Sequence, residues 1–427
     1  MVAVRHHAGM PTNYTGRSMG RPVLAALLLL SAISATAINN GVARTPPLGW
    51  STWETCGDEG CKHDYCNEHE VLQVADVLVS SGLRDLGWKY VNLDDCWGAM
   101  ARTASGALTW DVGRFPSGIP TLAERVHARG LKLGIYTSAG DTTCHGQAGS
   151  RGHYEADARA FASWGIDYVK FDWCGNIKDQ VWLGAQAHRE FAAAVNATGR
   201  SMAIEVVAGY FFLGAETPKY AHVWRFCTDH HDNWASTLTQ LECRADQGKV
   251  RGAPGGWASM DMLTTGGAGC GRAAHCPGQS EGEYRTEFVL WALTQSPLLV
   301  ATDLRTFTAP MRELMRNDEL IAHHQSTATP PGGRLGQWRC AEPLQCSIWG
   351  RSTAADGSQW LIALVNTGNR SHTIECQWKL LRWEKEVEAS VRDVLARRSP
   401  QNKTSGAVAA SVRPHDTVLL LLTQSHA

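Results

Sequence analysis

The sequence lacks an excess of charge of either sign. In 427 residues, 40 lysines and arginines are balanced by 41 aspartates and glutamates, and the formal net charge is −1. This balance gives no electrostatic reason to expect a nucleic acid or an anionic membrane as a partner. Nothing in the sequence decides the oligomeric state, and a homodimer is compatible with it.

Apolar runs long enough to span a membrane comfortably are lacking too. The run from Val23 to Ile33 is too short, but Arg17 and Arg21 precede it and the small residues Ala35-Thr36-Ala37 follow it. This order is typical of a cleaved signal, so we expect residues 1–37 to be a signal peptide. A retained anchor is the alternative. Because no second such run occurs, no stable membrane insertion is expected after cleavage.

The Cys-x-x-Cys knuckle of many zinc sites is also missing, although the chain has 13 cysteines. Several are closely spaced: Cys56, Cys61 and Cys66, Cys270 and Cys276, and Cys340 and Cys346. Such spacing favours disulfides in an oxidising compartment. A zinc site would instead use Cys56, Cys61, His63 and Cys66. We therefore expect a secreted or a lysosomal or vacuolar protein that follows the secretory pathway, with glycan acceptor sites at Asn196, Asn369 and Asn402.

The chain is too long for one small core, so we expect one large and one smaller domain. Short apolar strands alternate with longer amphipathic stretches, which predicts a (β/α)₈ barrel over residues 44–324, with a doubly wound open sheet as the alternative. The predicted strands are 48–51, 90–94, 132–136, 168–172, 202–206, 223–226, 255–257 and 297–301. The predicted helices include 68–83, 119–129, 154–164, 180–197 and 283–293.

Beyond the last predicted barrel strand, the character of the sequence changes. Residues 327–333 are rich in Thr, Pro and Gly and predict a linker. The runs 359–365 and 412–422 are strand-like and have no long helices between them. We expect a small antiparallel β-sandwich over residues 334–427. It could be a sugar-binding module or a structural support for the barrel, and the second interpretation is favoured.

The predicted strand 168–172 ends in charged rather than apolar residues. Because side chains alternate along a strand, Tyr168, Lys170 and Asp172 share one face, while Val169 and Phe171 point the other way. A lysine would favour the ionised form of Asp172, which could then act as a nucleophile. A structural ion pair is the alternative.

Other predicted strands also end near charged or hydroxyl-bearing residues. These are Asp94, Asp95, Tyr136, Glu205, Arg225, Asp229 and Asp261. In a barrel, active sites lie at the carboxyl ends of the strands, so the repeated placement favours a functional site over chance. Carboxylates can accept hydrogen bonds from sugar hydroxyls, and Trp53, Trp97 or Trp173 could cover the apolar face of a pyranose ring. Glycoside hydrolysis needs two such carboxyl groups, and the residues alone do not select the pair.

Six segments, in order, resemble the α-galactosidases of glycoside hydrolase family 27, and together they span about residues 44–304. They are Arg44 to Trp53, Asn92 to Trp97, Phe115 to Ile119, Gly130 to Tyr136, Trp164 to Asp172, and Pro254 to Trp257. The resemblance implies a retaining α-galactosidase on a (β/α)₈ barrel followed by an antiparallel β-domain. It implies no metal or organic cofactor.

Matched residue by residue, the resemblance places the nucleophile at Asp172 and the acid/base at Asp229. The implied substrate-binding residues are Trp53, Asp94, Asp95, Tyr136, Lys170, Glu205 and Arg225. The implied disulfides are Cys56 with Cys96, Cys61 with Cys66, and Cys144 with Cys174. Cys227 and Cys243 are a further candidate pair that no motif supports, and Cys376 is expected to be left over.

The chain departs from the family pattern at several positions. Ile204 and Ala221 replace a cysteine pair found in some members, and Ala258 to Met262 keeps only the second of two acidic residues, as Asp261. Glu205 would face the 2-hydroxyl of galactose and argues for that sugar, although Ala208 is small where galactosidases often carry bulk. Alternative activities are an α-N-acetylgalactosaminidase or a β-L-arabinopyranosidase. An inactive sugar-binding protein is disfavoured because both Asp172 and Asp229 are present.

Overall fold

The computed structural model describes residues 40–53, 65–246, 251–267, 277–338, 340, 345–399 and 403–425. The predicted signal peptide lies outside these residues, as do Cys56, Cys61, Cys270, Cys276 and Asn402. Within the described residues, no helix is both long enough and apolar enough to cross a membrane.

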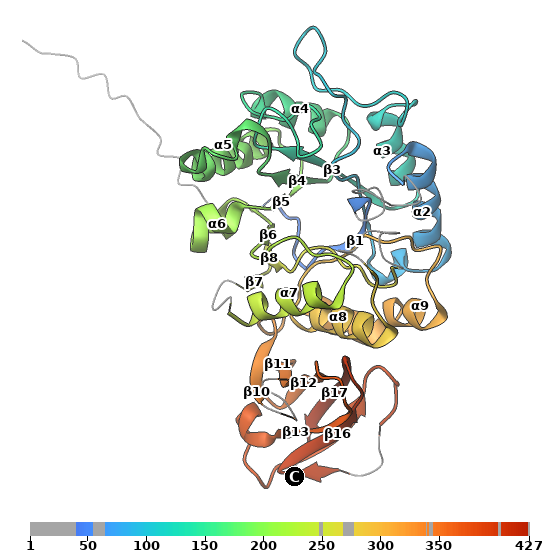
Figure 1. Ribbon diagram of the computed structural model, residues 1–427, viewed down its shortest axis with the longest axis vertical. Helices are drawn as coiled ribbons and strands as arrows, with labels where there is room; N and C mark the ends of the chain where they lie inside the picture. Colours follow the sequence, from blue (N-terminus) through green and yellow to red (C-terminus); the bar gives the residue numbers. More distant parts are fainter. Residues whose placement is uncertain are drawn as a thin grey trace, which may run out of the picture. The chain divides into compact units, whose positions relative to one another are not determined.

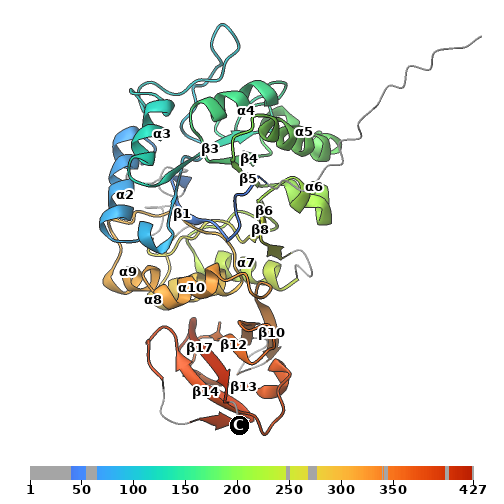
Figure 2. The ribbon, with the colours of Figure 1, turned by 180° about the vertical axis from the view of Figure 1, so that it is seen from behind.

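The larger part of the chain forms the predicted barrel, with strands at the centre and helices around them (Figure 1, Figure 2). Eight parallel strands are present among the described residues, in the order β8-β6-β5-β4-β3-β2-β1-β9. They are β1 (Leu48–Ser51), β2 (Tyr90–Asn92), β3 (Lys132–Ser138), β4 (Tyr168–Asp172), β5 (Ala203–Val206), β6 (Val223–Arg225), β8 (Gly256–Ser259) and β9 (Leu298–Val300).

Backbone hydrogen bonds close the barrel just beyond β8. Leu263 N–H donates to the Leu299 carbonyl, and Ala301 N–H donates to the Leu263 carbonyl, so Leu263 and Val300 form a parallel bridge. The short strand β7 (Gly252–Ala253) pairs antiparallel with β8 at the edge of the sheet. The closed sheet confirms the predicted barrel and rules out the open-sheet alternative.

The helices follow the strands along the chain. They are α2 (Glu68–Ser80), α3 (Ile119–His127), α4 (Tyr154–Ser163), α5 (Gly184–Ala197), α6 (Gly209–Leu213), α7 (Trp234–Asp246), α8 (Glu281–Leu293), α9 (Ala309–Met315) and α10 (Asp318–Gln325). Their starts are fixed by local chemistry: the Asn67 side chain caps α2, and Ser280 forms a capping box with Glu283 at α8.

Where strand ends differ from the prediction, hydrogen bonding explains the change. β2 stops at Asn92 rather than Asp94, because the Asp94 N–H is taken by the Thr52 hydroxyl instead of a neighbouring strand. β3 continues to Ser138, because Thr137 and Ser138 still pair with β4. The predicted helix 180–197 begins with a separate 3₁₀ turn, Val181–Leu183, and α5 starts only at Gly184.

The C-terminal part is the expected antiparallel sandwich. One sheet has the order β10-β11-β12-β17-β14-β15, and β13 and β16 form the second. Their bounds are β10 (Gly333–Trp338), β11 (Cys346–Ser352), β12 (Gln359–Asn366), β13 (His372–Gln377), β14 (Glu388–Asp393), β15 (Thr404–Ser405), β16 (Ala407–Val412) and β17 (Asp416–Gln424). Ile348, Ile374 and Leu422 lie in the core between the two sheets.

The sandwich packs on the barrel through α8. Trp349, Leu361 and Leu419 of the sandwich belong to the same buried apolar cluster as the barrel core. Arg285 on α8 forms a two-pronged ion pair with Asp416, at 2.8 and 3.0 Å. A shared core favours the structural support over an independent sugar-binding module.

The disulfides agree with the predictions in part. Cys144 is bridged to Cys174, and Cys227 to Cys243. Cys340 pairs with Cys346, while Cys376 is the one free cysteine among the described residues and is buried. Burial raises the pKa of the Cys376 thiol to about 12.

The expected pairs Cys56–Cys96 and Cys61–Cys66 are wrong in this structure, which bridges Cys66 to Cys96 instead. The reason is geometric: Cys66 lies just before α2 and its Cα is 6.1 Å from that of Cys96, within reach of a disulfide. With its sulfur bonded to Cys96, Cys66 has no thiolate to offer the alternative zinc site. Asn196 and Asn369, two of the predicted glycan acceptors, are exposed.

Candidate active site

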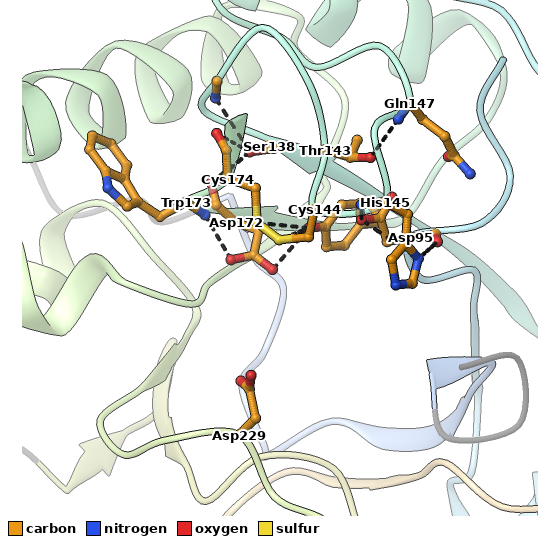
Figure 3. The surroundings of a disulfide bond; sticks show 12 residues. Asp95, Ser138, Thr143, Cys144, His145, Gln147, Asp172, Trp173, Cys174 and Asp229 are labelled. Carbon is orange, nitrogen blue, oxygen red and sulfur yellow. Dashed lines mark hydrogen bonds and ion pairs between the residues drawn. A yellow bond between two sulfur atoms is a disulfide. The ribbon is translucent and has the colours of Figure 1, made fainter. Parts of the chain in front are cut away.

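Asp172 ends β4 and is held from two sides. The Tyr136 hydroxyl donates to Asp172 Oδ2 at 2.9 Å, and the Trp173 backbone N–H donates to Oδ1 at 2.7 Å (Figure 3). Tyr136 is almost fully buried, and burial together with the nearby Asp172 raises its pKa well above the usual value. The tyrosine therefore keeps its proton and orients a half-buried carboxylate.

The loop after β4 is fixed against the loop after β3. Cys174 is bonded to Cys144, and its N–H donates to the Ser138 hydroxyl at 2.9 Å (Figure 3). Gly140 approaches so closely that a Cβ there would lie 1.9 Å from the Cys174 carbonyl oxygen, so only glycine fits. These contacts leave the segment that carries Asp172 little freedom.

Lys170 lies on the same face of β4 as Asp172, as the alternation predicted, but its direct partner is different. Its Nζ lies 2.8 Å from Asp94 Oδ2, and both residues are buried. Burial lowers the pKa of Lys170, but surrounding carboxylates, led by Asp94, raise it more, so the net shift is upward. The expected Lys170–Asp172 pairing is therefore replaced by a Lys170–Asp94 pair, and Asp172 feels the ammonium only at longer range.

Asp94 and Asp95 follow β2 and are both buried. Asp94 Oδ1 accepts the Asp95 N–H, and Asp95 Oδ2 accepts the His145 N–H at 2.8 Å. Asp95 Oδ1 has no hydrogen-bond partner within the described structure. Burial raises the pKa of both carboxyl groups, and for Asp94 the Lys170 ammonium offsets part of the rise. An unpaired buried oxygen of this kind suits a ligand hydroxyl.

The three candidate tryptophans have different surroundings. Trp53 stacks on His145 with ring centroids 5.9 Å apart, and Lys170 Nζ lies 5.0 Å from its ring centroid. Trp97 is packed edge-on against Trp164 and donates to the Tyr136 carbonyl, so the suggestion that it could cover a sugar is wrong. Trp173 points away from Asp229 (Figure 3). Trp53 is thus the best placed of the three.

Glu205 lies near the carboxyl end of β5 and is only 2% exposed. The Tyr168 hydroxyl donates to its Oε2 at 2.8 Å. Burial raises the pKa of Glu205 to about 7, although Lys170 and this hydrogen bond act in the opposite direction. The Glu205 carboxyl group therefore ionises near neutral pH.

Asp229 lies in the loop after β6, and its side chain is 56% exposed. Arg225 Nη2 pairs with Asp229 Oδ1 and also lies 3.1 Å from Asp261 Oδ2. Burial raises the pKa of Asp229, but the Arg225 guanidinium outweighs it and holds this pKa below its ordinary value. Arg225 Nε has no hydrogen-bond partner within the described structure.

The carboxyl groups of Asp172 and Asp229 point towards each other from opposite sides of the barrel's mouth (Figure 3). Asp172 ends β4 and Asp229 lies in the loop after β6, and Arg225, Lys170 and the Asp94–Asp95 pair supply charged groups at the same end of the sheet. One close set of metal-type ligands occurs among the described residues, namely Cys144, Asp172 and Cys174. Because its two sulfurs are joined in a disulfide, this set cannot supply thiolate ligands.

Two residues that hold the site's carboxyl groups, and the role of a third residue, were not predicted from the sequence. His145, in the loop after β3, donates its backbone N–H to Asp95. Tyr168 on β4 donates its hydroxyl to Glu205. Asp261 was noted as a carboxylate, but the structure shows it bridging Arg225 and the His230 backbone with a backbone φ of 71°. No local sequence signal marks these contacts, since each joins residues far apart in the chain.

Glycoside hydrolysis needs two carboxyl groups on either side of the scissile bond, and the facing carboxyl groups above this parallel barrel meet that requirement. The fold and the site therefore define the class of protein as a glycoside hydrolase. A family model described as "Alpha galactosidase A" matches residues 45–326, and one described as "Alpha galactosidase C-terminal beta sandwich domain" matches residues 345–422. The chain belongs to the α-galactosidase (melibiase) family, glycoside hydrolase family 27.

Individual relatives are similar to this chain over most of its length. "Alpha-galactosidase 3" of Arabidopsis thaliana is 36% identical over 394 residues, 90% of this chain and 83% of the relative. "Alpha-galactosidase A" of Homo sapiens is 34% identical over 360 residues, 80% of this chain and 79% of the relative. A Bacteroides fragilis crystal structure described as an α-galactosidase/melibiase superposes with a TM-score of 0.79 at 30% identity, covering 88% of this chain and 79% of that one.

Proposed function

We propose that this chain is a retaining exo-glycosidase that hydrolyses terminal α-D-galactosyl residues of oligosaccharides or glycoconjugates. The reaction class follows from membership of the family, whose relatives along most of the chain are named α-galactosidases. The observation that carries the mechanism is the facing pair Asp172 and Asp229 at the carboxyl ends of β4 and β6 (Figure 3).

In the first step, an Asp172 oxygen attacks the anomeric carbon while Asp229 gives a proton to the glycosidic oxygen, and the aglycone leaves as an alcohol. In the second step, Asp229 takes a proton from water, whose oxygen attacks the same carbon and frees Asp172. Tyr136 and the Trp173 N–H support Asp172 as nucleophile, because two hydrogen bonds fix the direction of its oxygens.

The remaining polar residues would hold the galactosyl ring. Asp95 Oδ1 and Arg225 Nε are buried polar atoms without a hydrogen-bond partner among the described residues, and they could bind hydroxyls. Trp53 has a ring face beside Lys170 that would contact the sugar. The buried Glu205 would bind the 2-hydroxyl of galactose through its carboxyl group. Asp94, Lys170 and Tyr136 complete the proposed substrate-binding set.

The two catalytic assignments are tested by separate substitutions. Asp172→Asn should abolish turnover of every α-galactoside at the glycosylation step. Asp229→Asn should lower kcat/KM strongly for methyl α-D-galactoside but much less for a dinitrophenyl α-D-galactoside, whose leaving group needs little protonation. Near-normal activity of Asp172→Asn would show that the nucleophile is assigned wrongly.

Ala208 is the observation that favours a neighbouring activity, because a small residue near the 2-position could admit an acetamide. Rates on p-nitrophenyl α-galactoside, α-N-acetylgalactosaminide and β-L-arabinopyranoside distinguish the three specificities.

We also propose that the protein is secreted, or lysosomal or vacuolar, and that residues 1–37 are removed on the way. The disulfides between described cysteines support an oxidising compartment. N-terminal sequencing of the mature protein tests the cleavage, and analytical ultracentrifugation tests the proposed homodimer.

A further inference from the structure

Glu287 on α8 is a buried carboxylate outside the proposed substrate-binding set, and it contacts the residue that follows Asp229. Neither Glu287 nor His230, the residue after Asp229, has appreciable solvent exposure. His230 Nε2 lies 2.9 Å from Glu287 Oε1. Burying an ionisable group costs free energy unless the group is paired and fully hydrogen-bonded. The surroundings of both side chains must therefore offset this cost.

The Glu287 carboxylate is well satisfied by donors. The Thr264 N–H donates to its Oε1 at 2.7 Å, the Thr264 hydroxyl donates to the same oxygen at 3.0 Å, and the Thr265 hydroxyl donates to Oε2 at 2.8 Å. Together with His230, these contacts join three elements: the loop after β6, the loop after β8, and α8. A carboxylate with several donors tolerates burial and rigidifies the groups around it.

His230 itself is held at three points. Its ring lies between Glu287 and the Ser236 hydroxyl, which is 3.0 Å from Nδ1. Its backbone N–H donates to Asp261 Oδ2 at 2.9 Å, and the same oxygen lies 3.1 Å from Arg225 Nη2. Arg225 in turn holds the Asp229 carboxylate. The main chain beside Asp229 and the Asp229 side chain are thus fixed by one connected set of contacts.

The need for this support is specific to Asp229. Its side chain is more than half exposed and its described hydrogen-bond partner is Arg225, whereas Asp172 sits on a strand and is held by Tyr136 and a disulfide-bonded loop. A general acid must lie within hydrogen-bond reach of the leaving oxygen, and displacement by about 1 Å can cost about a hundredfold in rate.

We infer that the His230–Glu287 pair is a positioning device for the acid/base, fixing the loop after β6 so that Asp229 reaches the glycosidic oxygen. This inference rests on the proposed function. Glu287 acts through His230 and does not touch the substrate, so its removal should affect proton donation and leave the nucleophile intact.

The test compares kcat/KM for methyl α-D-galactoside, which needs protonation of its leaving oxygen, with kcat/KM for a dinitrophenyl α-D-galactoside, which hardly does. In Glu287→Ala and His230→Gln, the ratio of the activated to the unactivated substrate should rise at least about tenfold. Glu287→Gln, which keeps the shape of the side chain, should change the ratio less than Glu287→Ala.

His324→Gln is the matched control. His324 is similarly buried, its Nε2–H donates to the Ser296 carbonyl at 2.8 Å, and it does not contact Glu287, His230 or Arg225 in the described hydrogen bonds. This variant should lose thermal stability with no change in the substrate ratio. If Glu287→Ala does not fold, the ratios of Glu287→Gln and His230→Gln decide the question.

Equal losses on both substrates in the Glu287 and His230 variants would overturn the positioning role while the proposed function stands. The wild type failing to hydrolyse either galactoside would instead overturn the proposed function. A raised ratio in His324→Gln of the same size would also contradict the inference, because general destabilisation would then explain it.

Discussion

The site brings together residues whose pKa values differ from those of free amino acids. Glu205 and Asp229 show opposite shifts. Burial raises the pKa of Glu205 to about 7, whereas pairing with Arg225 lowers the pKa of Asp229. The two groups lie on neighbouring barrel strands or the loops that follow them, yet one is almost inaccessible and the other is exposed. Burial and charge pairing therefore decide the state of each carboxyl group, and its position in the sequence does not.

Glu205 should set the choice of sugar. A carboxyl group facing an acetamide methyl would be left poorly paired, so we expect kcat/KM for p-nitrophenyl α-galactoside to exceed that for the α-N-acetylgalactosaminide by at least about a hundredfold. Glu205→Ser should shrink this ratio, whereas Glu205→Gln, which keeps the volume, should shrink it less. Comparable wild-type rates on the two substrates would move the protein to the neighbouring activity.

At the scale of elements, the loops after β3 and β4 act as one unit. The Cys144–Cys174 disulfide, the Cys174–Ser138 hydrogen bond and the close approach of Gly140 all join them. Asp172 and Tyr136 lie on the two strands that these loops follow. Constraint of the loops therefore also constrains Asp172, the proposed nucleophile.

Removing that disulfide should lower stability and activity together. In the chain-entropy model, a bond that closes a separation of 30 residues contributes roughly 3 to 4 kcal/mol, so the Cys144→Ser/Cys174→Ser variant should unfold at a clearly lower temperature and turn over more slowly. The matched control is Cys340→Ser/Cys346→Ser in the sandwich, which should lose stability while activity at 25 °C is kept. Peptide mapping that found Cys144 and Cys174 as free thiols in active enzyme would contradict this prediction.

At the scale of the whole molecule, barrel and sandwich share a core, and the Arg285–Asp416 pair is one of several ion pairs that join them. Asp416 is 5% exposed, and Arg285 is its partner on α8, with Arg413 as a second contact. Arg285→Ala would leave the buried Asp416 carboxylate with the exposed Arg413 as its described ion-pair partner and the Thr417 N–H as a donor, so we expect a loss of about 1 to 3 kcal/mol in stability. Urea unfolding checks this, with Arg189→Ala, at an exposed ion pair, as a control that should change little.

The pH dependence of stability should carry the signature of Glu205. Its folded pKa of about 7 lies above the ordinary value of 4.5, so its contribution to stability is fully present below about pH 4.5 and is lost as pH rises through 7. The loss amounts to roughly 3 kcal/mol. Glu205→Gln should match the wild type in urea unfolding near pH 4.5 and be more stable near pH 8; an unchanged difference across this range would refute the assignment.

The sequence by itself determined the order of strands and helices and the side of each strand that carries charge. It could do so because alternation along β4 and helical periodicity are local properties of the chain. The ends of the barrel strands were therefore predicted to within two residues. Phe171, predicted to face away from Lys170 and Asp172, packs against Phe191 of α5. The prediction that Asp172 and Asp229 are the catalytic pair came from the family resemblance, which rests on contiguous motifs, and the residues alone did not select it.

Only the tertiary structure decided which of these groups touch. Lys170 pairs with Asp94, 76 residues away, and His230 with Glu287, 57 residues away, because strand register and the return path of α8 bring them together. The partner of Cys96 and the burial of Trp97 likewise depend on how loops fold over the barrel. Local sequence fixes which face a side chain occupies, but the identity of its partner depends on long-range packing, which no local pattern records.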